Sequence, residues 1–375
     1  MPRIALTGGF GFLGWHTACR LRSRYGVEAV RLGRADLSDG RRLVDVVAGV
    51  DAVLHLAGVN RAASEEEVER GNVVAAEQLA DAVRAQRRPV RLVYANSIQS
   101  TSDNAYGRGK RRAATILEAA AADAGGTFAD VLLPNLFGEH GRPGYNSFVA
   151  TFAHAVAHGD APTVTVDREV PLLHAQDAAE VLVQAALESA SGELRPPGRI
   201  TRVSDVLDML RTMHALYARG EVPVLSTSFD VNVFNTYRAY RFPEMFPIAP
   251  QVHADRRGEL FETVRAHGGT GQAFVSTTRP GAVRGDHYHL HKIERFFVIK
   301  GEAEISLRRV LHDDVVTFRL DGRSPSFVDM PTLWVHNIRN VGDEDLITMF
   351  WADQLLDAES PDQYPELVTQ QGSTP

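Results

Sequence analysis

Residues 3–14 read RIALTGGFGFLG, an apolar strand that runs directly into glycines at positions 8, 11 and 14. The segment from Trp15 to Arg24 that follows has helical composition. In this order of strand, turn and helix, the first glycine permits a tight turn, the second lets the backbone approach a pyrophosphate, and the third lets helix and strand pack closely. The helix N-terminus adds unpaired N–H groups and a partial positive charge. The stretch predicts a dinucleotide site with cofactor-binding candidates Thr7, Gly8, Gly11, Phe12, Leu13 and Gly14.

The end of the second predicted strand, Glu28 to Leu32, bears on the choice of dinucleotide. At about twenty residues beyond the glycine turn, an acidic residue would bind the ribose 2′-hydroxyl, whereas an arginine accommodates a 2′-phosphate. Arg34 stands there and favours NADPH over NADH, although Asp36 is close enough to compete. The small-residue turn that ends the next buried strand adds the cofactor candidates Leu56, Ala57 and Gly58.

Strands and helices continue to alternate through the first half. Val90 to Ala95 reads as a strand, and the alanine-rich stretch from Ala113 to Ala124 reads as a helix that Gly125 and Gly126 end. This alternation is typical of a doubly wound α/β fold of the Rossmann type, with a parallel sheet.

A candidate catalytic set lies within this half. Tyr106 and Lys110 are four residues apart, a spacing that puts both on one face of a helix. A lysine cation can lower the pKa of a phenol, and the phenol can then exchange a proton with a carbonyl oxygen. Ser97, at the end of the preceding strand, can hold the same oxygen while hydride moves at the adjacent carbon. Taken alone the Tyr-x-x-x-Lys spacing is common, but downstream of a dinucleotide turn it predicts catalysis.

Length and composition limit the other possibilities. A chain of 375 residues is long enough for two domains. The net charge of −7 and the absence of a basic tract argue against a general nucleic-acid binder. The single cysteine, Cys19, fits a reducing compartment and reads as a small apolar residue within a helix. With neither a signal peptide nor a membrane-length apolar run, the expectation is a cytoplasmic protein without a membrane partner.

The second half has a different pattern. The stretch from Arg241 to Pro250 carries three prolines and reads as a linker, which places the boundary between domains at residues 244 and 245. Beyond it, short apolar runs are separated by turn residues, which predicts a small closed or sandwiched β-barrel. The predicted strands are Phe274–Thr277, Phe296–Ile299, Ala303–Leu307, Val315–Leu320, Trp334–Ile338 and Leu346–Trp351.

Histidines cluster in this half. His287, His289 and His291 stand at alternate positions, which in a strand would share one face, and Glu294 and His336 follow. Two histidines one residue apart, a glutamate and a distant histidine can bind one divalent metal through N and O ligands. The alternative is a sheet whose histidines are merely polar and solvated.

The first half resembles the extended short-chain dehydrogenase/reductases that act on nucleotide sugars. The resemblance rests on residues 7–14 and 56–58, on Ser97, Tyr106 and Lys110, and on the turn Pro134-Asn135-Leu136-Phe137-Gly138. Gly109 departs from the family, in which a serine usually precedes the lysine. The substrate-binding candidates are Asn135 in the family's substrate-side turn, Tyr145 and Asn146 in a loop bounded by glycine and proline, and Arg168, which could pair with a pyrophosphate.

The second half resembles the cupins. The spacing of Gly281, His287, His289, Glu294 and Gly301 reproduces the first cupin motif. The second motif is looser: Pro331, His336 and Asn340 are in register, but Leu333 stands where glycine is usual. Residues 255–258, Asp-Arg-Arg-Gly, resemble the start of cupin-type sugar 3- and 5-epimerases, in which an arginine holds the nucleotide phosphates, and Arg257 is the candidate for that role.

From end to end the chain is similar to the CapF type of bifunctional capsular-polysaccharide enzyme. The resemblance implies that the cupin domain inverts C3 of a UDP-4-keto-6-deoxy-HexNAc and that the first domain then reduces the C4 ketone with NADPH, toward an L-fucosamine-type precursor. It also implies zinc in the cupin domain and a homo-oligomer, with a dimer favoured. The nucleotide, UDP or dTDP, is left open.

Two interpretations of the histidine cluster remain. In one, His287, His289, Glu294 and His336 bind zinc, and Lys292 or His291 is the base. In the other, no metal is bound and His287 is the base, as in metal-free epimerases whose Arg-Gly-x-His pattern residues 284–287 echo. Two other functions compete with both: a reductase whose cupin is a non-catalytic sensing or dimerisation module, and an NAD-dependent nucleotide-sugar 4-epimerase or dehydratase.

Overall fold

The computed structural model describes residues 1–86 and 88–369, and the chain forms two compact units. The first comprises Met1–Phe148 and Val166–Val203, and the second comprises Val149–Thr165 and the chain from Ser204 onward. The proline-containing linker predicts a boundary at residues 244 and 245. The second compact unit also includes helices that precede this linker in the sequence. The predicted domain boundary therefore stays a prediction. No helix within the described ranges is both long enough and apolar enough to cross a membrane.

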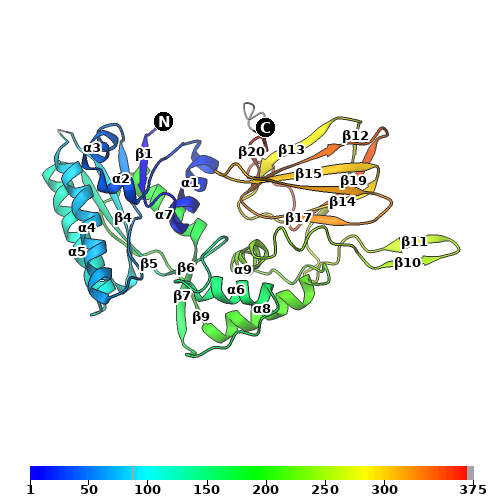
Figure 1. The fold of residues 1–375 in the computed structure, drawn as a ribbon, viewed down its shortest axis with the longest axis horizontal. Coiled ribbons are helices and arrows are strands. Elements are labelled where there is room, and N and C mark those ends of the chain that lie inside the picture. Colours follow the sequence, from blue (N-terminus) through cyan, green and yellow to red (C-terminus); the bar gives the residue numbers. More distant parts are fainter. Residues whose placement is uncertain (87, 370–375) are drawn as a thin grey trace. The chain divides into compact units, whose positions relative to one another are not determined.

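The first unit is built on a six-stranded parallel sheet in the order β2-β1-β3-β4-β5-β8. Figure 1 labels β1, β4 and β5 of this sheet. Its strands are β1 (Ile4–Thr7), β2 (Val30–Leu32), β3 (Ala52–His55), β4 (Arg91–Ser97), β5 (Thr127–Leu133) and β8 (Gly192–Leu194). Its helices include α1 (Phe12–Tyr25), α2 (Arg34–Ser38), α3 (Gly40–Ala48), α4 (Glu65–Arg84), α5 (Ala105–Asp123) and α7 (Ala175–Leu187). A smaller sheet joins β6 (Asn135–Phe137), β7 (Glu169–His174) and β9 (Arg199–Arg202). The predicted doubly wound sheet is confirmed, and its order reverses at β1, the position where such sheets bind ligands.

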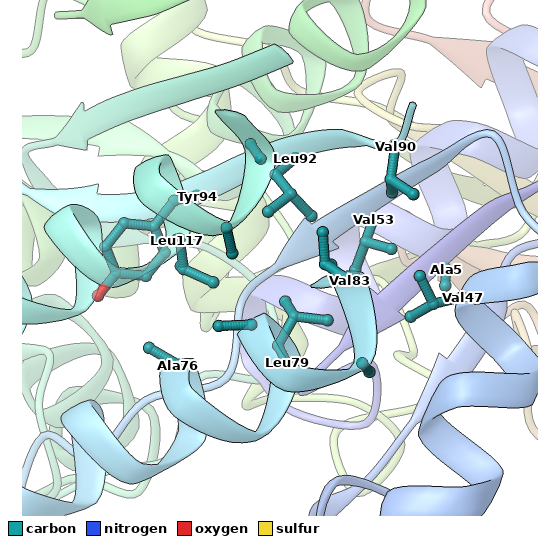
Figure 2. Close-up of a cluster of buried hydrophobic side chains, with 14 of the residues drawn as sticks. Ala5, Val47, Val53, Ala76, Leu79, Val83, Val90, Leu92, Tyr94 and Leu117 are labelled. Atoms are coloured by element: carbon teal, nitrogen blue, oxygen red, sulfur yellow. The ribbon is translucent and has the colours of Figure 1, made fainter. Parts of the chain in front are cut away.

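One core of this unit lies between the sheet and the helices α3, α4 and α5. Leu79 and Val83 of α4 and Leu117 of α5 pack there with Val53 of β3 and Leu92 of β4 (Figure 2). All these side chains are buried, and burying each contributes about 1.5–3 kcal/mol. Because helices cover the parallel sheet, β1 is buried along its whole length and consists of three apolar residues and a threonine, which is why it could be recognised from residues 3–7.

Helix α5 begins earlier than the predicted Ala113 and therefore carries Tyr106 and Lys110. The side chain of Asn104 caps it by accepting a hydrogen bond from the N–H of Gly107 at 2.8 Å. A Cβ at Gly107 would lie 2.4 Å from the carbonyl oxygen of Ser102, and one at Gly109 would lie 3.0 Å from the Cα of Glu69 in α4. The departure at Gly109 thus lets α4 and α5 approach closely and leaves the Tyr-x-x-x-Lys helix regular.

The second unit contains two antiparallel sheets, ordered β12-β19-β14-β17 and β16-β15-β18-β13-β20. Their strands are β12 (Gln272–Thr278), β13 (Val283–Tyr288), β14 (Glu294–Lys300), β15 (Glu302–Arg309), β16 (Val315–Asp321), β17 (Phe327–Met330), β18 (Trp334–Asn340), β19 (Leu346–Ala352) and β20 (Tyr364–Pro365). The six predicted strands are confirmed. Both sheets contribute to one core, exemplified by Phe296 and Phe350 from the first and Ile305 and Ile338 from the second. This is the sandwiched form of the predicted all-β fold.

Up to residue 369, where the description ends, the second unit also contains three helices and one hairpin. The helices are α6 (Phe148–Ala157) and α8 (Val203–Tyr217), each of which starts at the last residue of a segment of the first unit, and α9 (Ser228–Ala239). The strands β10 (Val252–Asp255) and β11 (Gly258–Phe261) pair with each other as a two-stranded antiparallel sheet. This hairpin contains residues 255–258, the segment that resembles sugar epimerases.

Candidate functional site

The glycine turn of the first unit has the geometry of a phosphate-binding turn. Gly8 has φ of +67°, and a Cβ there would lie 2.8 Å from the backbone nitrogen of Ala57. A Cβ at Gly14 would lie 2.1 Å from the carbonyl oxygen of Gly8, so only glycine fits. Gly11 is the N-cap of α1 and supplies no side-chain hydrogen bond, which leaves the first N–H groups of the helix available to an anion.

The region after β2 carries the residues that bear on the 2′ position. The N–H of Gly33 donates to the Asp36 carboxylate at 2.7 Å, and Arg42 forms an ion pair with the same carboxylate. Asp36 is therefore engaged by the protein itself. Arg34 is exposed at the start of α2, and the Arg31 guanidinium lies 4.7 Å from the ring centre of Phe10 in the glycine turn. Two arginines, Arg31 in β2 and Arg34 at the start of α2, are therefore the positive charges at the end of this strand.

Ser97, Tyr106 and Lys110 are brought together at the end of β4. Tyr106 is largely buried; burial raises the pKa of its phenol, while a hydrogen bond with Ser97 acts in the opposite direction. The Lys110 ammonium donates to the carbonyl oxygen of Ala95 at 2.7 Å and lies 4.3 Å from the ring centre of Tyr94. In the protein as described, Ser97 rather than Lys110 is thus the group that opposes the rise in the phenol pKa.

Burial dominates the electrostatics of Lys110. It lowers the pKa of the ammonium to about 7, with the negative charge of Asp130 as the opposing influence. Asp130 in turn accepts a hydrogen bond from the side chain of Asn96 at 3.0 Å. Burial thus shifts the pKa values of both Tyr106 and Lys110, and such shifts are typical of residues that transfer protons.

The substrate-side candidates of the first unit take up different positions. Asn135 donates to the carbonyl oxygen of Pro171 at 3.2 Å and lies at the start of β6. The ring of Tyr145 is flanked by two guanidinium groups, from Arg61 at 5.9 Å and from Arg142 at 5.3 Å. The last two candidates, Asn146 and Arg168, are exposed. Arg61 and Arg142 are neighbours that the sequence pattern did not identify as site residues.

In the second unit, four side chains converge between the two sheets. His287 and His336 are paired residues on β13 and β18, His289 follows β13, and Glu294 begins β14 in the other sheet. The Nε2 atoms of His287, His289 and His336 lie 3.7, 2.9 and 3.5 Å from one oxygen of Glu294. The four ligand atoms all lie within 4.8 Å of one another. The predicted set of metal ligands is therefore assembled in one place.

The orientation of the imidazoles fits a metal. The Nδ1 atom of His289 lies 2.5 Å from the carbonyl oxygen of Asp362, and that of His336 lies 3.0 Å from the carbonyl oxygen of Trp334. A hydrogen on each Nδ1 leaves the lone pair of Nε2 directed at the cluster, the arrangement found in metal-binding histidines. Apart from their contact with Glu294, the Nε2 atoms of His287, His289 and His336 are buried without a hydrogen-bond partner among the described residues. A divalent ion would satisfy these three nitrogens together.

The charges of the cluster support the same interpretation. Burial raises the pKa of the Glu294 carboxyl, but the neighbouring histidines, His289 foremost, outweigh that effect and hold the pKa well below its usual range. Burial lowers the pKa of His336 to about 4, although the contact with Glu294 opposes the change. An ionised carboxylate and a neutral imidazole are the protonation states that bind metal.

Lys292 and His291 are arranged differently beside this cluster. Lys292 is buried, with its Nζ 3.6 Å from the second oxygen of Glu294 and 3.3 Å from the carbonyl oxygen of Pro361. The alternation of His287, His289 and His291 predicts that all three share one face. His291 does not, because β13 ends at Tyr288. Its Nδ1 lies 3.3 Å from the side-chain oxygen of Asn232, outside the group of ligands.

Two features near the cupin motifs also depart from simple expectation. Leu333 adopts a φ of +64°, which explains why glycine is usual at this position; such strain costs about 1–3 kcal/mol in a residue with a side chain.

The Arg257 guanidinium is exposed in the turn between β10 and β11, where it binds the Asp255 carboxylate at 2.6 Å. Arg257 is thus not part of the histidine cluster.

Comparisons with known proteins agree with both halves. The model of the NAD dependent epimerase/dehydratase family matches residues 4–196, and that of the polysaccharide biosynthesis C-terminal domain matches residues 253–364. A UDP-2-acetamido-2,6-beta-L-arabino-hexul-4-ose reductase from Pseudomonas aeruginosa is 32% identical over 96% of this chain and 98% of its own length. A probable low-salt glycan biosynthesis epimerase from Haloferax volcanii is 28% identical over 30% of this chain and 80% of its own length.

Solved structures give the same result over the whole chain. The capsular polysaccharide assembling protein CapF from Staphylococcus aureus is similar with a TM-score of 0.62 and 26% identity, over 97% of this chain and 99% of that one. CapF with the inhibitor 3-isopropenyl-tropolone is similar with a TM-score of 0.58 and 25% identity over the same shares.

Proposed function

The chain belongs to the NAD dependent epimerase/dehydratase family and, over its whole length, to the CapF-type enzymes of nucleotide-sugar metabolism, and on that premise we propose a two-step reaction. The second unit epimerises C3 of a UDP-linked 4-keto-6-deoxy-HexNAc, and the first unit reduces the C4 ketone with NADPH. The product is an L-fucosamine-type precursor. The observation that carries the proposal is that one chain contains both a Ser-Tyr-Lys set beside a dinucleotide turn and a buried cluster of three histidines and a glutamate.

In the reduction, the residues of the first unit manage the proton. NADPH, when bound at the glycine turn, supplies the hydride to C4. The Tyr106 phenol donates its proton to the ketone oxygen as that oxygen becomes a hydroxyl, and Ser97 holds the same oxygen by a hydrogen bond. Lys110, charged below a pKa of about 7, supplies positive charge near the phenol, and that charge stabilises the phenolate that forms when Tyr106 donates its proton. Asn135, Tyr145, Asn146 and Arg168 are assigned to the substrate.

In the epimerisation, the C4 ketone acidifies the hydrogen on C3. Zinc, when bound by His287, His289, Glu294 and His336, supplies a positive charge that stabilises the enolate oxygen. Lys292 is assigned the transfer of a proton at C3, because it is buried beside the cluster while His291 is directed elsewhere. Arg257 is assigned to the nucleotide phosphates. Reduction at C4 removes the ketone and makes the inversion permanent, so epimerisation comes first.

The proposed epimerase step is tested by hydrogen exchange in deuterated water without NADPH. We expect mass spectrometry and NMR to show one deuterium entering the keto-sugar at C3 only when the protein is present. A second unit that is a sensing or dimerisation module would leave the C3 hydrogen in place, and that result would overturn the proposal. A 4-epimerase or dehydratase that retains its nicotinamide through turnover is excluded if the protein consumes one NADPH for each sugar reduced.

The proposed preference for NADPH is tested at Arg34. Replacing Arg34 with glutamate removes a charged partner of the 2′-phosphate, and hydrogen bonds to charged groups contribute about 1.5–3 kcal/mol. We therefore expect the ratio of kcat/KM for NADPH to that for NADH to fall by about 10–100-fold. Arg41→Glu changes the same charge on the exposed side of α3 and is the control. An equal fall of this ratio in Arg34→Glu and Arg41→Glu would contradict a specific role for Arg34.

A further inference from the structure

We propose that Asp362 is a positioning residue of the metal centre: it holds the turn between the ligands His289 and Glu294 and fixes the tautomer of His289. The inference rests on the proposed metal-dependent epimerase site and deepens it. Asp362 lies about seventy positions downstream of this turn, in a segment that no sequence motif identified.

The first observation is how the Asp362 carboxylate is used. One of its oxygens accepts the N–H of Leu290 at 3.0 Å, and the other accepts the N–H groups of His291 and Lys292, both at 2.8 Å. The next N–H, of Ile293, donates to the Asp353 carboxylate at 2.9 Å. Two aspartate side chains thus accept all four backbone N–H groups of the turn that separates the two ligands.

The second observation concerns the main chain of the same residue. The carbonyl oxygen of Asp362 lies 2.5 Å from Nδ1 of His289, and a bond there leaves Nε2 of that ring as the free lone pair. Asp362 adopts a φ of +43°, a conformation that side chains disfavour except in asparagine and aspartate. One residue therefore fixes both the backbone beside His289 and the direction of its imidazole.

The third observation is that the segment carrying Asp362 is itself anchored. Strand β20 pairs with β13, the strand that carries His287. Buried Arg308 donates to the carbonyl oxygen of Val368 at 2.7 Å and to the Glu366 carboxylate at 2.7 Å. The chain that follows Asp362 is thus tied to both β13 and β15, so it can hold Asp362 in place beside the ligands.

The physical consequence is a dependence of metal affinity on Asp362. A ligand that must be reoriented before binding costs free energy, and substitutions of outer partners of metal ligands typically weaken metal binding by 10–100-fold. Lys292 lies on the same turn and donates to the carbonyl oxygen of Pro361, so the segment also places the residue assigned to C3.

The test is a zinc competition titration of the full chain against a chelating indicator, for wild type and Asp362→Asn. Asparagine tolerates the positive φ but puts an NH₂ group against at least one backbone N–H. We expect the zinc dissociation constant to rise by about 10–100-fold. We also expect the visible spectrum of the cobalt-substituted protein to change, because it reports the geometry of the ligands. A constant within twofold of wild type with an unchanged cobalt spectrum would overturn the inference.

Controls separate positioning from stability. Asp357→Asn changes an exposed aspartate of the same segment and should bind zinc as wild type does. A merely structural role would lower the melting temperature of the metal-free chain without altering zinc affinity, and that pattern also counts against the inference. Should Asp362→Asn fail to fold, Arg308→Gln loosens the segment from outside the turn; weaker zinc binding supports the proposal and unchanged binding overturns it. Wild type that binds no zinc refutes the metal centre itself, and with it the inference.

Discussion

Replacing Tyr106 with phenylalanine is expected to lower kcat for ketone reduction by about 10²–10⁴-fold, the usual contribution of a positioned general acid. The substitution removes only the hydroxyl from a largely buried ring, so packing within α5 should be retained. NADPH oxidation with the epimerised keto-sugar as substrate measures the loss. Deuterium incorporation at C3 should be unchanged, because the exchange is assigned to the second unit.

A matched control removes a hydroxyl elsewhere in the same unit. Tyr25, the last residue of α1, donates its hydroxyl to the Glu180 carboxylate at 2.5 Å. Tyr25→Phe should leave the rate of ketone reduction nearly unchanged.

Ser97→Ala should lower kcat for ketone reduction by about 10²–10³-fold, as expected for the loss of one donor to the developing oxyanion. A Tyr106→Phe variant that keeps more than a tenth of wild-type kcat would show that another group protonates the ketone.

The pKa of Lys110 adds a pH dependence to the stability of this unit. The folded-state pKa of about 7 lies below the unfolded value near 10.5. The unfolded chain therefore binds more protons between these values, so wild-type stability rises with pH from about 7 to 10. Lys110→Met lacks this contribution. The melting temperature of wild type minus that of Lys110→Met should therefore increase as the pH rises from about 7 to 10.

The parts that sequence predicted are those whose physics is local. The glycine turn is recognisable because a Cβ at Gly8 or Gly14 collides with backbone, which leaves glycine as the only fit. The candidate metal ligands could be recognised because His287 and His289 are close in sequence and Glu294 follows. The strands of the second unit alternate with turn residues, so their positions were predicted to within a few residues.

The parts that sequence missed depend on distant partners. His291 was expected on the face of His287, but the pairing of β13 with β18 is irregular between Gly285 and His287, and the strand ends at Tyr288. The register of β13 is set by its neighbour strand and not by its own alternation. No motif in the neighbouring sequence identifies Asp362, because its contacts with residues 289–292 form only when the C-terminal segment lies beside β13.

Replacing Lys292 with methionine is expected to lower the rate of C3 deuterium exchange by about 10²–10⁴-fold while zinc content and ketone reduction are retained. Methionine fills a similar volume in the buried position but cannot carry a proton. Because Lys292 is not among the ligand atoms of the cluster, loss of exchange with a full complement of zinc would separate proton transfer from metal binding.

The same variant decides between the two interpretations of the histidine cluster. If His287 were the base and no metal were bound, Lys292→Met would exchange the C3 hydrogen at a rate near that of wild type, and His287→Asn alone would abolish exchange. If zinc is bound by the cluster, His287→Asn should lose zinc and exchange together, whereas Lys292→Met loses only exchange. Lys300→Met, at the exposed end of β14, removes a lysine paired with Glu344 and controls for the change in charge. Retained exchange in Lys292→Met with zinc present would move the proton transfer to another residue of this site.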